Sequence, residues 1–176
     1  DQIDYDYKAG AVLIANTTNW CSSDAAYDNT FATADQSMGS CWTSSFGGNK
    51  NVWFKFTAAT NFIKASVSTG NVFGTMQRQQ AALWNSSGVQ VACVKWINAQ
   101  GTITMQTDTL KPGNQYWISV DDDLVSGTFS LCVTDQIDYD YKAGAVLIAN
   151  TTNWCSSDAA YDNTFATADQ SMGSCW

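Results

Sequence analysis

The sequence contains one long stretch twice. Residues 1–42 reappear without a mismatch at residues 135–176, which is 134 residues further along the chain. Diverged domains differ first at their surfaces, so complete identity indicates a tandem duplication, the alternative being a cloning artefact. The period matches a whole domain of about 100–150 residues and exceeds the roughly 20–50 residues of a solenoid repeat. We therefore expect the chain to be a fragment of a longer tandem array of identical domains.

This period sets the expected domain boundaries. Residues 1–134 form one complete repeat, which opens on an acidic lead-in at residues 1–7, and residues 135–176 begin an identical second repeat. A chain as long as one repeat buries enough surface for its own core, whereas one as short as the duplicated stretch does not. Residues 135–176 are thus expected to be a truncated second domain, or a segment that completes a neighbouring one.

The charge of the chain disfavours several classes of function. The formal net charge is −8, all 16 acidic residues are Asp, and His is absent. Nucleic acids require a basic face, anionic membrane surfaces repel an acidic chain, and no apolar run is long enough to span a bilayer. We therefore expect no nucleic-acid partner and no membrane insertion. Because His is the usual general base, we also expect no enzymatic activity.

Each repeat carries four cysteines, an even number that is typical of disulfides formed in an oxidising compartment. We favour a Cys21–Cys41 pair, because both residues lie in the duplicated stretch, which leaves Cys93 to pair with Cys132. The alternatives are other pairings and buried free thiols, while zinc is disfavoured without His or a Cys-x-x-Cys pair. The expected disulfide cysteines are Cys21, Cys41, Cys93, Cys132, Cys155 and Cys175.

Alternation of apolar and polar residues predicts many short strands and no helix of ten or more residues. An acidic set made only of Asp also favours a loop-rich β protein. Pro112 and Gly113 suit the second and third positions of a type II turn. The expectation is therefore a β-sandwich or barrel. The expected strands are residues 9–15, 31–34, 52–57, 62–69, 81–84, 89–96, 102–107, 116–120 and 128–133, with an acidic turn at 121–127.

Four motifs follow one another between residues 51 and 133. They are NVWFKFTA at Asn51–Ala58, ALWNSSG at Ala82–Gly88, LKPGNQYWISV at Leu110–Val120 and GTFSL at Gly127–Leu131. In this order they resemble the bacterial pre-peptidase C-terminal domain family. The resemblance implies a fold class that is all-β, a jelly-roll-like antiparallel β-sandwich, here tandemly repeated.

The stretch from Cys21 to Trp42 resembles the version of this domain found in large secreted surface proteins of gliding Bacteroidota. In those proteins the domains form tandem arrays within adhesins, which usually leave the cell by the type IX secretion route. The resemblance therefore implies an extracellular or cell-surface location. A single appendage on a secreted peptidase is the simpler arrangement in the family, and the duplication departs from it.

The densest charge cluster is a candidate Ca²⁺ site, because hard cations prefer several oxygen ligands. Asp4 and Asp6, or their copies Asp138 and Asp140, are candidates for further ligands at the junction between repeats. The alternative is a solvated acidic loop, since the spacing of an EF-hand is absent. The cluster consists of Asp121, Asp122 and Asp123.

Two tryptophans and one threonine are further candidates. Trp53 and Trp117 lie out of phase with the aliphatic faces of their strands, which makes them candidates for surface exposure and ligand binding. Exposed aromatic rings stack on sugars or pack against a neighbouring domain, and the alternative is core packing. Thr109, within Asp-Thr-Leu, resembles the short acidic-Thr-apolar site that Bacteroidota O-glycosylate.

The expected function is that of a non-enzymatic structural or adhesive repeat in an extracellular surface adhesin or filament, stiffened by disulfides and by packing between repeats. The expected partners are neighbouring identical repeats or chains in a filament, together with surface glycans. No cofactor is expected beyond the Ca²⁺ candidate. The alternatives are a carbohydrate-binding module and an accessory domain of a secreted peptidase. Identical neighbours also invite exchange of elements between domains, so a fibre in which one leading segment completes another domain is a variant of the main hypothesis.

Overall fold

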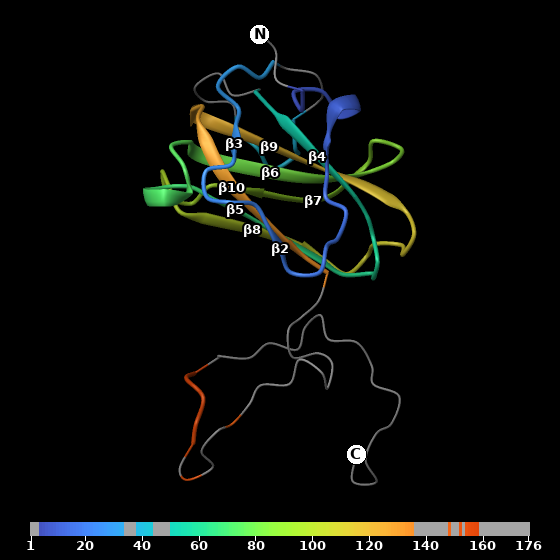
Figure 1. Ribbon diagram of the computed structural model, residues 1–176, viewed down its shortest axis with the longest axis vertical. Coiled ribbons are helices and arrows are strands. Elements are labelled where there is room, and N and C mark those ends of the chain that lie inside the picture. Colours follow the sequence, from blue (N-terminus) through green and yellow to red (C-terminus); the bar gives the residue numbers. More distant parts are fainter. Residues whose placement is uncertain are drawn as a thin grey trace. The chain divides into compact units, whose positions relative to one another are not determined.

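The first part of the chain folds into an all-β sandwich, as the sequence predicts. The computed structural model describes residues 4–33, 38–43, 50–135, 148, 152 and 154–158. The chain divides into two compact units, Asp1–Asp135 and Gln136–Trp176. The first unit contains two five-stranded sheets (Figure 1). Its boundary lies one residue beyond the end of the repeat expected from the sequence.

Each sheet combines strands from the beginning of the repeat with strands from its later part. The first sheet has the spatial order β1 (Val12–Leu13), β4 (Val52–Thr57), β9 (Gln115–Val125), β6 (Gln77–Asn85) and β7 (Gln90–Lys95). The second has the order β2 (Trp20–Cys21), β10 (Thr128–Thr134), β5 (Ile63–Ser68) and β8 (Thr102–Thr107), with β3 (Tyr27–Asp28) also paired to β10. Two short 3₁₀-helices are η1 (Lys8–Gly10) and η2 (Asn71–Phe73).

The main core lies between the two sheets and follows the period-two pattern of the sequence. In β8, residues alternate strictly between exposed and buried, with Ile103 and Met105 inside. Side chains on the inner faces of facing sheets must interdigitate, so apolar residues recur at every second position. The central members of this core are Phe54, Phe56, Leu83, Ile118, Phe129 and Leu131.

Three expectations about secondary structure need correction. Strand β9 continues to Val125, so residues 121–125 belong to a strand rather than to an acidic turn. This extension has a partner, because β6 pairs with β9 from Asn85 back to Gln77. Of the strand expected at residues 31–34, the described residues 31–33 are not in a strand, and Tyr27–Asp28 pairs with β10 instead. The first strand is also shorter than expected, since η1 occupies Lys8–Gly10.

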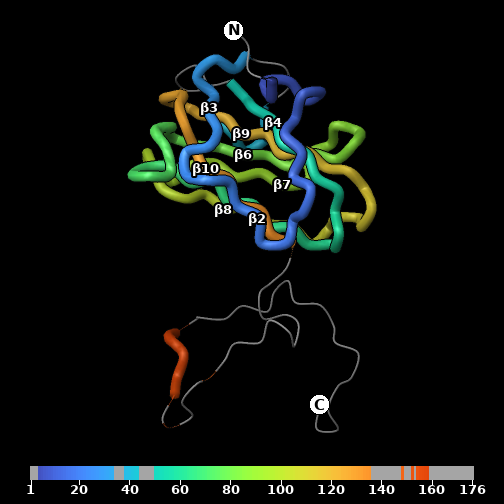
Figure 2. The backbone as a smooth tube through the Cα atoms, in the orientation of Figure 1, coloured from blue at the N-terminus to red at the C-terminus, as the bar shows by residue number. Residues whose placement is uncertain are grey.

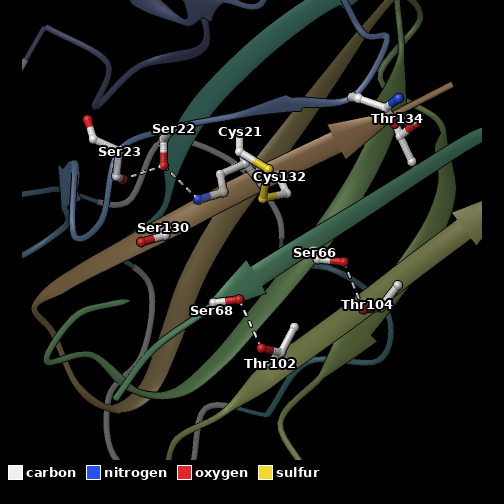
Figure 3. The surroundings of a disulfide bond; sticks show 12 residues. Cys21, Ser22, Ser23, Ser66, Ser68, Thr102, Thr104, Ser130, Cys132 and Thr134 are labelled. Carbon is white, nitrogen blue, oxygen red and sulfur yellow. Dashed lines mark hydrogen bonds between the residues drawn. A yellow bond between two sulfur atoms is a disulfide. The ribbon is translucent and has the colours of Figure 1, made fainter. Parts of the chain in front are cut away.

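The outer faces of the two sheets differ. The outer face of the second sheet is polar, and Ser66 and Ser68 of β5 approach Thr104 and Thr102 of β8 at 2.9 Å each (Figure 3). The outer face of the first sheet instead carries a second apolar cluster, which the beginning of the repeat covers. This cluster consists of Ala11, Trp42, Trp53, Ala82 and Trp84. The first sheet is thus buried on both faces, which makes the domain three layers thick at this point.

The second cluster gives a stability test. Because Trp53 is 0% exposed, Trp53→Ala should leave a large cavity and lower the free energy of unfolding by about 3–5 kcal/mol. Phe31→Ala is the control, since Phe31 is 70% exposed and its truncation should change stability by no more than about 0.5 kcal/mol. Urea unfolding of the oxidised protein measures both values. Equal effects of the two substitutions would contradict a covered outer face.

Candidate functional site

The candidate site is the seam where the beginning of the repeat joins the rest of it. We call residues 1–42 the leading segment and residues 50–134 the strand core. In the leading segment, β1 pairs in parallel with β4, and β2 and β3 pair antiparallel with β10. Figure 2 shows this segment as the blue tube running along the domain. Strands β4 and β10 would otherwise be edge strands with unpaired backbone groups, so the leading segment completes both sheets.

Two disulfides fasten the seam, and their pairing differs from the one favoured by the sequence. Cys21 is bonded to Cys132, and Cys41 is bonded to Cys93. The expectation of Cys21–Cys41 and Cys93–Cys132 was wrong because cysteines that are near in sequence lie on different sheets. Cys21 sits directly opposite Cys132 in the pairing of β2 with β10 (Figure 3). Cys41 lies over the outer face of the first sheet, beside Cys93 of β7.

A buried asparagine of the leading segment also links this segment to the strand core, through hydrogen bonds. Asn29 is 0% exposed, and its amide nitrogen donates to Asp122 Oδ2 at 2.9 Å and to the Lys50 carbonyl at 3.0 Å. The Gly127 N–H donates to Asn29 Oδ1 at 2.9 Å. A buried polar group is tolerated when its hydrogen bonds are satisfied, so Asn29 fixes the register of the seam. The sequence gives no local signal for this role.

Asp6 plays a comparable part near the start of the leading segment. It is 0% exposed, and its carboxylate accepts from the Thr33 N–H at 2.6 Å and from the Thr33 hydroxyl at 2.8 Å. Asp6 thus ties two parts of the leading segment together. Its expected role as a Ca²⁺ ligand at a junction has no support in these contacts, and its copy Asp140 lies outside the described residues.

Asp135, the first residue of the second copy, closes the first domain. It is 4% exposed, and its carboxylate accepts hydrogen bonds from the hydroxyls of Thr17 and Thr18. Its N–H donates to the Thr17 carbonyl at 3.1 Å, and its carbonyl accepts from the Thr60 hydroxyl at 3.0 Å. One repeat therefore ends on a residue that belongs, by sequence, to the next.

Trp53 does not form an exposed ligand-binding site. It is fully buried in the second apolar cluster, where its ring centroid lies 6.5 Å from that of Trp84. Trp117 is partly buried against the same cluster, and Lys8 Nζ lies 4.4 Å from its ring centroid. Both tryptophans are out of phase with the aliphatic faces, as the sequence shows, but the leading segment covers the face on which they stand. Trp53 therefore serves core packing, the alternative that the sequence left open.

The three consecutive aspartates are separated rather than gathered at one point. Asp121 Oδ1 accepts from the N–H groups of Lys50 and Asp122 at 2.8 Å each. Asp122 accepts from the Asn29 amide, and Asp123 Oδ2 lies 3.6 Å from the Arg78 guanidinium. In a strand successive side chains point to opposite faces, and no three Cys or Asp side chains among the described residues could together hold a metal ion. The Ca²⁺ expectation therefore has no support in the geometry.

Burial gives one of these carboxyls an unusual pKa. Desolvation raises the pKa of Asp121 from its ordinary 3.8 to about 7, against the opposing effect of the hydrogen bonds from the Lys50 and Asp122 N–H groups. The neighbouring charge of Asp122 raises it further. Asp121 is 0% exposed, so the charged form lacks solvation and the protonated form is favoured up to neutral pH.

Two surface hollows contain other residues of interest. One, of about 240 Å³, is lined by the Cys21 and Cys132 pair with Lys64 and Ser66. The other, of about 300 Å³, includes Thr109, which is exposed and lies 2.8 Å from the Thr107 hydroxyl. O-glycosylation of Thr109 remains a prediction. In the second unit Cys155 is exposed and in no disulfide, while Cys175 and Asp138 lie outside the described residues.

Comparisons with known proteins add a structural similarity. No family model matches the chain, and no curated protein matches it. The structure is similar to the crystal structure of the pre-peptidase C-terminal domain of a collagenase from Bacillus anthracis, with a TM-score of 0.40 and 18% sequence identity. The match covers 70% of this chain and 94% of that one. Across the described residues, no helix has the length and apolar character needed to cross a membrane.

The raised pKa of Asp121 predicts a pH dependence of stability. A folded pKa above the unfolded value means that the folded state binds the proton more tightly. This contribution is complete below about pH 4 and is lost as the pH rises through about 7. We expect the free energy of unfolding to fall over this window by roughly 1 kcal/mol per pH unit, and by at most about 4 kcal/mol.

Asp121→Asn is the matched variant, because an amide keeps the oxygen that accepts from Lys50 and Asp122 but does not ionise. The other charged side chains near the site, Asp122, Asp123 and Arg78, are unchanged in it. Its stability should fall less than that of the wild type between pH 4 and pH 8, as measured by urea unfolding across the range. Parallel profiles for the two proteins would exclude Asp121 as the source.

Proposed function

We propose that this chain is part of a non-enzymatic structural or adhesive array on the outside of a cell, built from identical sandwich domains. The observation that carries the proposal is the position of the Cys21–Cys132 bridge. It joins a strand near the start of the repeat to the last strand, across a sequence separation of 111. The bridge therefore lies on the shortest covalent path between the two ends of the repeat.

A bridge in this position determines how the domain responds to tension. A pull on the two ends would pass from the leading segment through the disulfide into β10, and the residues between the two cysteines would be bypassed. The second bridge, Cys41–Cys93, lies wholly within the bypassed loop, so it serves folding stability rather than the force path. A protein that holds a surface or links a filament benefits from such a limit on its extension.

The two ends of the domain also suit a linear array. Tyr5 accepts a hydrogen bond from the Trp53 N–H beside the start of β4 and meets Asp28, which pairs with the start of β10. Asp135 follows the far end of β10. In Figure 1 the dark-blue start of the described chain and the end of the orange strand β10 lie at opposite ends of the domain. Successive domains can therefore extend in one direction.

Several features support an extracellular location and weaken the rival functions. Disulfides persist in oxidising compartments outside the cytosol, and both bridges here fasten the leading segment to the strand core. The carbohydrate-binding alternative loses Trp53 as a sugar contact, because this ring is buried. The repetition of the sequence favours an array over a single appendage on a peptidase.

Electron microscopy of the native material tests the array directly. A compact domain of this length should measure roughly 35–45 Å across by the scaling of radius with chain length. We expect filaments with a regular repeat near this size, or somewhat longer where linkers extend. Isolated globules without a regular spacing would contradict the proposal and would favour the peptidase-appendage alternative.

Single-molecule stretching tests the force path. In the oxidised protein, only residues 1–21 and 132–134 of the repeat lie under tension, about 24 residues that reach at most about 85 Å. Complete reduction should raise the limit to about 470 Å for the whole repeat. The measured quantity is the gain in contour length on unfolding, which is smaller than these limits by the length of the folded domain.

Two cysteine-pair variants make the stretching experiment specific. C21S/C132S leaves only the inner bridge, so about 83 residues should extend to about 290 Å. C41S/C93S keeps the outer bridge and should retain the short wild-type limit of about 85 Å. A long extension in C41S/C93S, or a short one in C21S/C132S, would overturn the assignment of the force path to Cys21–Cys132.

A further inference from the structure

We infer that the Cys21–Cys132 bridge is a site of thiol–disulfide exchange with a small anionic thiol, which binds in the hollow beside the bridge and opens it without unfolding the domain. The exchange is a property of this site alone. Its mechanical consequence rests on the proposed function, because the same bridge limits the extension of the domain.

The first observation is that this bridge can be reached from solvent. Cys21 is exposed and Cys132 is half-buried, and both line the hollow of about 240 Å³. This volume is near the lower end of the roughly 300–1,000 Å³ that small-molecule pockets occupy. Trp20 and Val133 contribute apolar surface to the same hollow. The hollow therefore has the size for a small molecule that carries a thiol.

The second observation is the arrangement of side chains around Cys132. Strand β10 lies between β2 and β5, so Cys132 has Cys21 opposite it on one side and Ser66 opposite it on the other (Figure 3). Lys64 precedes Ser66 by two residues on the same face of β5 and also lines the hollow. Side chains in this diagonal relation interact when one of them is long. A thiolate that attacks Cys132 in line with the S–S bond therefore approaches over β5, past Lys64.

The third observation is the charge of the hollow. Among the described residues that line it, Lys64 is the charged one, and its side chain is exposed. No carboxylate in the described part of the chain forms an ion pair with Lys64. The net charge of −8 makes the protein as a whole repel anions, so an ammonium group marks this point for them. Carboxylates on a thiol compound add to the attraction that its thiolate already feels.

The exchange proceeds in two balanced steps. The thiolate of the external compound attacks Cys132 Sγ, a mixed disulfide forms on Cys132, and Cys21 leaves as a thiolate that water solvates. A second molecule of the compound then attacks the external sulfur of the mixed disulfide and releases the Cys132 thiolate. One protein disulfide is reduced, and two thiol molecules are oxidised to their own disulfide. That disulfide closes the bridge again by the reverse steps.

Other contacts keep β2 on β10 after the bridge opens. The Ser22 N–H donates to the Leu131 carbonyl at 2.9 Å, and the Leu131 N–H donates to Ser22 Oγ at 3.1 Å. The second bridge, Cys41–Cys93, still ties the leading segment to the first sheet. Its cysteines are partly buried against the second apolar cluster, so an external thiol reaches them less readily. Opening of the exposed bridge thus changes the limit of extension while the sandwich stays assembled.

Differential alkylation of the wild-type chain tests the selectivity. Free thiols are blocked first, the protein is treated with glutathione at low ionic strength, and newly formed thiols are alkylated and located by peptide mapping. We expect Cys21–Cys132 to open at least about tenfold faster than Cys41–Cys93, because access to the sulfur controls the rate. The circular dichroism should be unchanged while only the first bridge is open. Equal rates for the two bridges, or loss of the β signal with the first, would overturn the inference.

Lys64→Glu reverses the charge of the hollow, and Lys111→Glu is its matched control, since Lys111 is exposed and lines the other hollow. The measured quantity is the rate of opening of Cys21–Cys132 with glutathione, an anionic thiol, divided by the rate with cysteamine, a cationic one. Lys64→Glu should lower this ratio about fivefold at low ionic strength and much less in concentrated salt, where charges are screened. Equal ratios in the two variants would contradict recognition of an anionic thiol by Lys64.

Stretching separates this inference from the proposed function. Molecules in which glutathione has opened only Cys21–Cys132, and whose thiols are then alkylated, should extend to about 290 Å instead of about 85 Å. If the exchange is selective but the limit stays short, the exchange site stands and the force path is wrong. If the exchange is not selective, the exchange site is wrong, and the force path is still decided by the cysteine-pair variants.

Discussion

Pairing of the leading segment with β4 and β10 is the interaction on which the rest of the domain depends. Without it both sheets would end in bare edge strands, and backbone groups left unpaired away from water carry a substantial free-energy cost. The same segment brings Ala11 and Trp42 onto the outer face of the first sheet, where they cover Trp53 and Trp84. It also brings Asn29 to the buried carboxylate of Asp122. Edge pairing, outer-face burial and the internal polar contact are therefore consequences of one docking event.

The two disulfides stabilise this pairing, but the pairing itself brings the cysteines together. Cys21 and Cys132 already face each other in the register of β2 and β10, so the covalent bond follows from the strand pairing. A cross-link in this register removes conformational freedom from the unfolded chain over a long loop, the case in which the entropic gain is expected to be large. The bond also joins the two ends of the repeat. The Cys21–Cys132 bond thus both stabilises the folded domain and connects the two ends of the repeat covalently.

Local patterns in the sequence predicted the strands of the strand core well, because the period-two alternation of β4, β5, β8 and β10 reports burial on one face. Other features depended on contacts that no local pattern contains. Trp53 has the phase of a surface residue because its face is outer with respect to the sandwich, yet the leading segment forms a third layer above it. The aspartates at 121–123 resemble a turn by composition, but β6 and the Lys50 N–H group hold them in a strand. The disulfide pairing failed for the same reason, since proximity in sequence did not correspond to proximity across the seam.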